Sequence, residues 1–497
     1  MTQVLPTVIS LRPQGATLFG QPRGLATLFL TEMWERFTYY GMRAILILFM
    51  TAKITEGGLG VDDRTASSLY GLYIGGTYVL SLAGGWIADR LIGAQRAVIS
   101  GGALITLGNV TLIACNARTF IPGLCAISLG VGLLKPNISA LVAQLYPEGG
   151  ARRDAGFSVF YMGINLGAFF GALLVPLCTA YLGWHWGFAL PAIGMLFGLA
   201  QFVLTRSNLG SSGSGVTAEH VDGSWLPIVV LLVVVVATAG LFITGIVRID
   251  PRALSSALSS SIAVLAAGYF IHMAFFSGLT PTERSRVYVM VALFAASAVF
   301  LAGIEQSGAS FNLFAERYTK LTLFGWQMPA GVLQATSALF TILFAPLFAA
   351  LWLSLGRRGK DPAPSTKFAA GLALMGCGFL VMYVASRFVI AGSKVLPTWL
   401  ILTYLLHEFG DLCLSPVGLS SMTKLAPKRY VGQAMGLWFL SIALGNNFAG
   451  QLSREYDASD LLSLPGLFLK VFWYALGAST VLLIFTPALK RLMRGVN

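Results

Sequence analysis

Charged and hydroxyl-bearing aromatic side chains form one stripe near the start of the chain. They stand at i, i+3, i+4, i+7, i+8 and i+11, a spacing that places them on one face of a helix over three turns: Glu32, Glu35, Arg36, Tyr39, Tyr40 and Arg43. The other faces of this segment carry Leu, Phe, Met and Ile. Acids beside bases can exchange protons and bind charged solutes, so the stripe predicts a polar wall that faces a water-filled cavity.

Further ionisable residues stand inside apolar segments elsewhere in the chain: Lys135, Glu305, His407, Glu408 and Asp411. An ionisable side chain at the centre of a membrane costs at least about 2.5 kcal/mol, so each of them is a candidate functional residue. Ion pairs that only lock helices together are the alternative. Two acids, two bases and two tyrosines on one stripe exceed what one such contact needs, which favours a functional site.

Composition indicates the surroundings in which these residues lie. Of the 497 residues, 56% are hydrophobic and 11% are charged, and the mean hydropathy is +0.76. A soluble domain has about 25% charged residues because its surface faces water. Apolar runs of about 20 residues recur along the chain, long enough to cross about 30 Å of hydrocarbon as helices. The sequence therefore predicts an all-α polytopic membrane protein surrounded by lipid.

Fourteen such runs are predicted, arranged as six, a hairpin of two, and six. Their approximate limits are 23–52, 67–91, 96–115, 120–146, 152–182, 186–206, 225–247, 253–276, 287–317, 326–355, 366–390, 395–422, 429–453 and 464–490. We expect an N-terminal bundle over 1–206, a linker and hairpin over 207–286, and a C-terminal bundle over 287–497. The hairpin carries almost no ionisable residue, so we expect it outside the transport core and facing lipid.

The net charge of +13 has a topological explanation. Basic residues collect in loops that the positive-inside rule places in the cytoplasm, for example around Arg90, Arg152, Arg357 and Lys490. We therefore expect a multi-pass protein of the cytoplasmic (inner) membrane with both termini in the cytoplasm. Nucleic acid is not an expected partner.

Motifs typical of enzymes and metal sites are missing from the sequence. The five cysteines show no CxxC spacing, which argues against a metal site. There is no Walker loop, no cluster of His and Cys ligands and no GxSxG elbow. A channel would carry rings of one charge sign, whereas acids and bases both occur here. We expect neither an enzyme nor a channel, and no metal or organic cofactor.

Several motifs resemble one family. The six-plus-six layout and the loop GGWIADRLIGAQR at 84–96 are similar to the major facilitator superfamily, in which two halves rock about a site at the membrane midplane. EMWERFTYYG at 32–41 resembles the ExxERFxYYG motif of the proton-coupled oligopeptide transporters. FYMGINLG at 160–167, GLLKPNIS, EQSGASFNLFA, PSTKF, SPVGLS and MGLWFL also match that family. The resemblance covers nearly the whole chain and implies a monomeric symporter that imports di- and tripeptides with protons.

The resemblance also implies a peptide site between the halves. Its substrate-binding residues would be Arg36, Tyr39, Tyr40, Tyr78, Lys135, Asn165, Ser337, Asp411, Trp438 and Phe439. Arg36 and Lys135 would hold the peptide carboxylate, because a guanidinium offers paired donors and an ammonium adds a point charge. Asn165 and Asp411 would take the peptide ammonium from opposite halves.

Proton coupling would rest on carboxylates, with the proton gradient as the energy source. The implied residues are Glu32, Glu35 and Glu305. The resemblance further implies two gates across the halves, Arg43 with Glu305 on the outer side and Lys135 with Asp411 on the inner side. Lys135 would then alternate between the substrate and its gate partner.

Three positions depart from the family pattern. Asp411 is one methylene shorter than the usual glutamate, and Leu301 stands where a tryptophan is common. The asparagine expected near Ser337 is missing, which leaves Ser337, Gln334 or a water to contact the peptide ammonium. A proton-coupled carrier of nitrate or another small metabolite on the same fold is the alternative function. The intact ExxER motif and Lys135 favour peptides.

Overall fold

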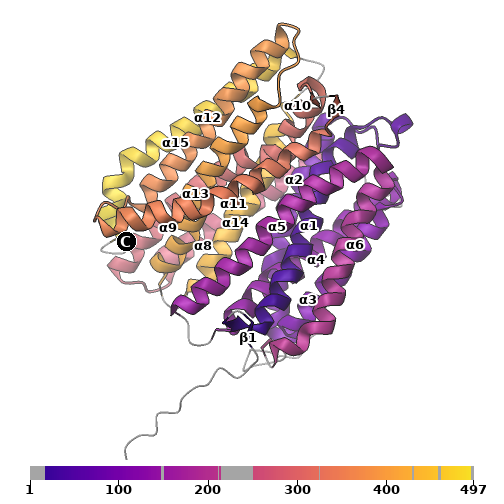
Figure 1. The fold of residues 1–497 in the computed structure, drawn as a ribbon. Coiled ribbons are helices and arrows are strands. Elements are labelled where there is room, and N and C mark those ends of the chain that lie inside the picture. Colours follow the sequence, from indigo (N-terminus) through magenta and orange to yellow (C-terminus); the bar gives the residue numbers. More distant parts are fainter. Residues whose placement is uncertain are drawn as a thin grey trace, which may run out of the picture.

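The computed structural model describes residues 17–18, 20–146, 150–210, 212–213, 250–323, 325–427, 430–456 and 461–493, and it is almost entirely helical. The long helices run side by side, from the end near β1 to the opposite end near β4 and α10 (Figure 1). The predicted all-α class is confirmed. The predicted span 225–247 lies outside the described residues, as does most of the linker before it.

The N-terminal group contains six long helices. They are α1 (Arg23–Thr51), α2 (Asp63–Ile87), α3 (Ala94–Leu112), α4 (Ala117–Gln144), α5 (Gly150–Leu182) and α6 (Trp184–Thr205). A π-helical turn at Ala88–Ile92 joins α2 to α3 through Gly93 at φ 79°. The short strands β1 (Thr17–Leu18) and β2 (Gln21–Pro22) pair antiparallel before α1.

The C-terminal group follows α8 (Pro251–Ile271), the described helix of the hairpin. It contains α9 (Pro281–Ile304), α10 (Ser310–Tyr318), α11 (Ala335–Arg357), α12 (Pro364–Ile390), α13 (Thr398–Leu425), α14 (Val431–Ser453) and α15 (Leu464–Met493). The strands β3 (Thr322–Leu323) and β4 (Trp326–Gln327) form a second antiparallel hairpin.

Two predicted spans differ from the observed elements. The span 287–317 is broken, because α9 ends at Ile304 and a 3-10 turn at Glu305–Gly308 separates it from α10. The span 326–355 begins as strand β4, and its helix starts only at the 3-10 turn Ala330–Gln334. Apolar periodicity does not reveal either change, since a 3-10 turn keeps side chains as buried as an α-helix does.

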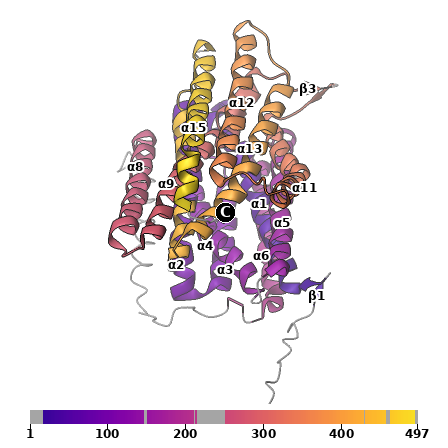
Figure 2. The ribbon, with the colours of Figure 1, turned by 90° about the vertical axis from the view of Figure 1, so that its left-hand side faces the viewer.

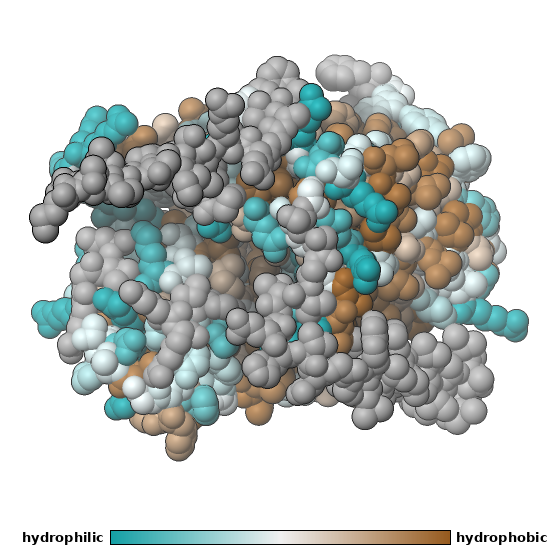
Figure 3. Space-filling view, turned by 90° about the horizontal axis from the view of Figure 1, so that it is seen from below, coloured by the Kyte–Doolittle hydropathy of each residue, from teal (hydrophilic) through white to brown (hydrophobic). Residues whose placement is uncertain are grey.

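Nine helical segments among the described residues are long and apolar enough to cross a membrane. α1 is not in this set, because the charges of the stripe lower its hydropathy. Hydrophobic residues cover the right-hand flank of the molecule when it is viewed from below, and hydrophilic residues gather over its middle (Figure 3). This distribution fits a protein whose sides lie in lipid.

The two groups meet along two helix pairs. α2 packs against α14 and α5 packs against α11, so each group supplies two helices to the seam. At the α2–α14 contact Gly71 lies on Gly450, and a Cβ on Gly71 would stand 2.8 Å from the Gly450 Cα. Small residues allow membrane helices to approach this closely. The division of the chain at 206 and 287 stays a prediction.

α8 lies at the flank of the molecule, where it packs on α2 and α14 (Figure 2). Its outward face is apolar and exposed, with Val264 70% and Leu265 64% accessible. Its inward face carries Ser255 and Ser259, whose hydroxyls bond to the amide groups of α14. α8 therefore exposes an apolar side, while its other side is tied to the seam by polar contacts. Its contact with lipid stays a prediction.

The FYMGINLG motif positions the charged stripe. Glycines at intervals of four residues on α5, at Gly163, Gly167 and Gly171, let the α1 backbone lie directly against α5. A Cβ on Gly167 would stand 2.9 Å from the Arg36 Cβ and even closer to the Met33 carbonyl. The motif thus sets the distance between the two helices and holds Arg36 at the surface of α5.

We expect Gly167→Val to lower stability by about 1–3 kcal/mol, because the added methyl groups would force α1 away from α5. The measurement is the thermal unfolding midpoint of the purified protein in detergent micelles. Gly477→Val in α15 is the matched control, since no atom lies within 4 Å of a Cβ placed there. Equal midpoints for the two variants would contradict this account of the motif.

Candidate functional site

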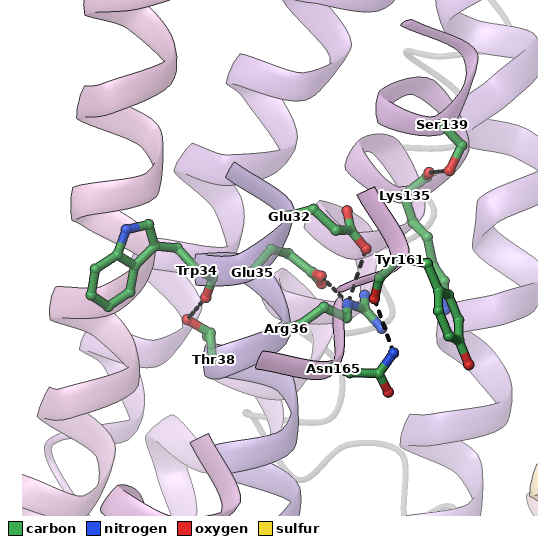
Figure 4. Close-up of polar contacts among 9 residues, drawn as sticks. All are labelled: Glu32, Trp34, Glu35, Arg36, Thr38, Lys135, Ser139, Tyr161 and Asn165. Atoms are coloured by element: carbon green, nitrogen blue, oxygen red, sulfur yellow. Dashed lines mark hydrogen bonds and ion pairs between the residues drawn. The ribbon is translucent and has the colours of Figure 1, made fainter. Parts of the chain in front are cut away.

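Arg36 is the centre of the site on α1. Its Nε lies 3.3 Å from Oε1 of Glu32 and also donates to Oε2 of Glu35. The three side chains point toward one another (Figure 4), and each residue is at most 3% exposed. Taking isolated charges out of water costs several kcal/mol for each ion, so these groups stabilise one another only as a cluster.

The cluster keeps unused hydrogen-bonding groups. Nη2 of Arg36, Oε2 of Glu32 and Oε1 of Glu35 have no hydrogen-bond partner among the described residues. A buried polar atom without a partner costs about 1–3 kcal/mol. The unpaired donor of Arg36 suits an anionic group of a ligand. The two unpaired carboxylate oxygens suit protons.

Aromatic rings and α5 surround the cluster. The Arg36 guanidinium lies over the Tyr39 ring at 4.9 Å, and Nζ of Lys135 lies over the Tyr78 ring at 3.9 Å. Asn165 of α5 stands beside Arg36 (Figure 4), and its Nδ2 donates to the Tyr161 carbonyl at 2.9 Å. Four of the predicted substrate-binding residues, Arg36, Tyr39, Tyr78 and Lys135, thus lie together and come from α1, α2 and α4.

Arg43 joins the two groups on the side away from β1. Its Nη2 lies 3.1 Å from Oε2 of Glu305 and donates to the Ser307 hydroxyl at 2.5 Å. Its Nε donates to the Tyr70 hydroxyl at 2.9 Å. The predicted partnership of Arg43 with Glu305 is therefore present in the geometry, and the Arg43 guanidinium also lies 5.6 Å from the Tyr40 ring centroid.

The break between α9 and α10 makes this contact geometrically feasible. The 3-10 turn Glu305–Gly308 presents Glu305 and Ser307 together to Arg43. Gly308 leaves the necessary space, because a Cβ there would stand 2.7 Å from the Arg43 Nε. In a continuous α-helix residues i and i+2 lie about 160° apart around the axis, against about 120° in a 3-10 turn, so the two side chains would point further apart.

A second ion pair crosses the seam near the same end. Both Nη atoms of Arg317 on α10 bond to Asp63 at the start of α2, at 2.6 and 2.8 Å. The pair is bidentate and only partly exposed, which makes it stronger than a typical surface ion pair. Sequence reasoning missed it because Asp63 and Arg317 stand at helix ends that are 254 residues apart.

The C-terminal wall is held by local contacts. Asp411 accepts a hydrogen bond from Ser415 one turn later on α13. Glu408, which the sequence marked only as a buried charge, accepts a hydrogen bond from Thr341 of α11 at 2.7 Å. Ser337 stands one turn before Thr341 and is half-buried. Both acids are therefore bound by hydroxyl groups of their own half.

The remaining predicted site residues lie on α14. Trp438 is 4% exposed and packs edge-on against Phe368 of α12 at 6.4 Å, while Phe439 is half-buried. His407 of α13 is 1% exposed and lies against the rings of Phe311 and Phe379. These aromatic neighbours favour a structural role for this histidine.

The structure does not bring Lys135 and Asp411 together. No ion pair joins them in the part of the chain that the structure describes, although Arg43–Glu305 and Asp63–Arg317 are both formed. Asn312 adds a further bridge, donating from α10 to the Ala44 carbonyl of α1 at 2.9 Å. The two groups are thus tied together at the end that carries α10, and the predicted inner pair is open.

Comparison with known proteins places this geometry among transporters. The model of the POT family matches residues 95–464. The "Peptide transporter YePEPT" of Yersinia enterocolitica is 40% identical, with 98% of each chain covered. The "Di-/tripeptide transporter" of Lactococcus lactis is 35% identical, covering 89% of this chain and 91% of that one.

Solved structures of similar sequence have a similar fold. The crystal structure of "peptide transporter POT in complex with sulfate" has a TM-score of 0.89 and 39% identity, with 97% of each chain covered. This likeness confirms the predicted fold class, an all-α membrane protein of the major facilitator type. It identifies the chain as a multi-pass membrane protein.

The Asp63–Arg317 pair can be tested by breaking and restoring it. We expect Arg317→Gln to raise the labelling rate of a Ser67→Cys reporter by an impermeant maleimide about tenfold, the effect of about 1.4 kcal/mol. Ser67 is fully buried on α2 beside Gly450, so it reacts only when the groups separate there. The experiment uses a background in which the five native cysteines are replaced.

The charge-reversed double variant D63R/R317D serves as the control for this experiment. It restores an ion pair of opposite polarity and is expected to label at nearly the original rate. A labelling rate that stays unchanged in R317Q would show that the pair does not hold the groups together.

Proposed function

Because the chain belongs to the POT family, we propose that it is a proton-coupled symporter that imports di- and tripeptides by alternating access. The observation that carries this proposal is Arg36, a buried guanidinium that is bonded to Glu32 and Glu35 and retains one free donor. Relatives that are named peptide and di-/tripeptide transporters support the substrate class.

The peptide carboxylate binds at the N-terminal half. Arg36 offers the free Nη2 donor, Lys135 adds a second positive charge, and the hydroxyls of Tyr39 and Tyr78 stand near them. A guanidinium matches the geometry of a carboxylate through paired N–H donors. The peptide carboxylate therefore competes with the carboxylates of Glu32 and Glu35 for Arg36.

The peptide ammonium binds at the opposite wall. Asn165 supplies its amide oxygen from α5, and Asp411 supplies a carboxylate from α13, with Ser337 on α11 as a further acceptor. A ligand needs charges at both ends to contact both halves. Side chains of the peptide lie against Tyr40, Trp438 and Phe439, whose apolar surfaces tolerate many residue types.

Exchange of partners on Arg36 couples the peptide to protons. When the peptide carboxylate bonds to Arg36, Glu32 and Glu35 lose part of their positive partner. A buried carboxylate that loses its counter-cation favours its neutral form, so it takes up a proton. Protonation of Glu305 in the same way would release Arg43 and open the outer gate, while Lys135 and Asp411 close the inner one.

The proposal includes the placement of the protein. It lies in the cytoplasmic membrane with both termini in the cytoplasm, as the positive-inside rule predicts. With this orientation the Arg43–Glu305 and Asp63–Arg317 pairs lie at the outer side, so the described state is closed outward. The protein works as a monomer on the proton gradient, without a cofactor, enzymatic activity or nucleic-acid partner.

Uptake of labelled dialanine into proteoliposomes tests the proposal. An inward proton gradient is expected to accumulate dialanine above its outside concentration, and unlabelled di- and tripeptides are expected to compete. Nitrate and free amino acids are expected to leave uptake unchanged. Failure of dialanine to enter or to be displaced by other peptides would overturn the peptide assignment.

The coupling role is tested separately. We expect Glu32→Gln and Glu35→Gln to abolish accumulation driven by the proton gradient, because a side-chain amide does not take up a proton near neutral pH. Exchange of labelled for unlabelled dialanine across the membrane is expected to persist in part, since Arg36 is kept.

Glu56→Gln is the matched control, because Glu56 lies in the exposed turn Ile54–Glu56 away from the site. Its accumulation is expected to equal that of the parent. Full accumulation by both the E32Q and E35Q variants would show that protons are carried elsewhere.

A further inference from the structure

A cavity lies in the C-terminal half, and none of its lining residues belongs to the candidate peptide site. It is a crevice of about 590 Å³ whose floor is α9 and whose walls are α14 and α15. Val299, Ala302 and Gly303 line the floor, while Leu452 and Tyr474 line the two walls. α9 and α15 belong to segments that are long and apolar enough to cross a membrane, so the apolar part of the crevice fits a lipid chain.

The outer end of this crevice is cationic. Arg454 and Glu455 line it and also line an adjoining cavity of about 440 Å³, together with Arg64 and Arg252. Lys470 stands at the same end, where its Nζ bonds to both oxygens of Glu455 at 2.7 and 2.9 Å. An apolar crevice thus leads into a mouth formed by guanidinium groups.

The charged residues at the mouth differ in their partners. Arg252 pairs with Asp62 at 3.2 Å, and Glu455 is occupied by Lys470. Arg454 donates to the Arg252 carbonyl at 3.3 Å, and it forms no ion pair with any residue in the described part of the chain.

The electrostatics of Arg454 agrees with the lack of an ion pair. Burial and the charge of Arg252 lower the pKa of its guanidinium, with Asp250 opposing them. An anion beside Arg454 would relieve this repulsion.

We propose that this crevice binds an anionic phospholipid, with the phosphate held by Arg454 and Arg252 and an acyl chain lying on α9 between α14 and α15. Arginine is the preferred partner of phosphate because its planar fork matches two oxygens at once. Trp473 and Tyr474 are 59% and 56% exposed beside the crevice, and such aromatic residues are typical of the membrane interface.

Binding has a consequence for the outer gate, a point that rests on the proposed function. The crevice floor at Ala302 and Gly303 is the last turn of α9, which ends immediately before Glu305. A chain packed on this turn restrains the residues that present Glu305 to Arg43. The lipid therefore stabilises the outward-closed state.

Native mass spectrometry of the full-length protein, delipidated in detergent and then supplied with phosphatidylglycerol, tests the binding site. Arg454→Gln is expected to weaken phosphatidylglycerol binding about fivefold, the effect of one cation near an anionic headgroup. Lys394→Gln is the matched control, because Lys394 is an exposed cation on the same side of the molecule. It is expected to bind like the parent.

A second variant keeps the proposal testable if R454Q folds poorly. Leu452→Trp fills the crevice without changing any charge, and it is expected to weaken phosphatidylglycerol binding to a similar degree. Phosphatidylcholine is expected to bind more weakly to the parent and to be insensitive to R454Q. Equal phosphatidylglycerol binding by the parent, R454Q and L452W would overturn the proposal.

Inorganic phosphate distinguishes a lipid from a free anion. We expect phosphatidylglycerol, but not inorganic phosphate, to raise the thermal unfolding midpoint of the parent in an Arg454-dependent way. An equal rise with phosphate alone would overturn the lipid assignment. Both measurements are made without peptide, so their outcome is independent of whether dialanine is transported.

Discussion

The structure depends on the cost of burying charge on α1. Glu32 and Glu35 share Arg36 as their counter-cation, and removing Arg36 would leave both carboxylates uncompensated in a medium that solvates them poorly. The same constraint applies to Arg43, which needs Glu305 from the other half. The three charges around Arg36 are therefore matched within one half, whereas Arg43 finds its counter-charge only across the seam. This difference links local protonation to the arrangement of the two halves.

Backbone features serve this charge arrangement. The glycines of α5 bring α1 close enough for Arg36 to lie beside Asn165, and the break after Ile304 turns Glu305 and Ser307 toward Arg43. A helix interruption inside a membrane is tolerated where it is buried in protein, as it is here. The seam is strengthened by contacts with no titratable partner, such as Asn312 with the Ala44 carbonyl, so the outer closure does not rest on ion pairs alone.

Much of the fold and of the charged stripe could be predicted from the sequence, but the contacts between distant helices could not. Apolar runs located the helices, and the spacing of Glu32 and Arg36 correctly placed both on one face. The 3-10 turn Glu305–Gly308 was missed because the apolar pattern of α9 resumes in α10 after it. Asp63–Arg317 and Thr341–Glu408 were missed for another reason: a pair formed by two distant helices leaves no periodic signal in either of them.

The two walls of the site are prepared differently for a peptide. Arg36 keeps a donor without a partner, whereas Asp411 and Glu408 are already bonded to the hydroxyls of Ser415 and Thr341. A hydroxyl gives a neutral donor, and a peptide ammonium forms a stronger, charge-assisted bond with the same carboxylate. The carboxylate end of a peptide therefore satisfies a group that lacks a partner, and the ammonium end replaces a weaker bond by a stronger one. Under the proposed function, a ligand with both charges gains at both walls, while an anion alone gains at only one.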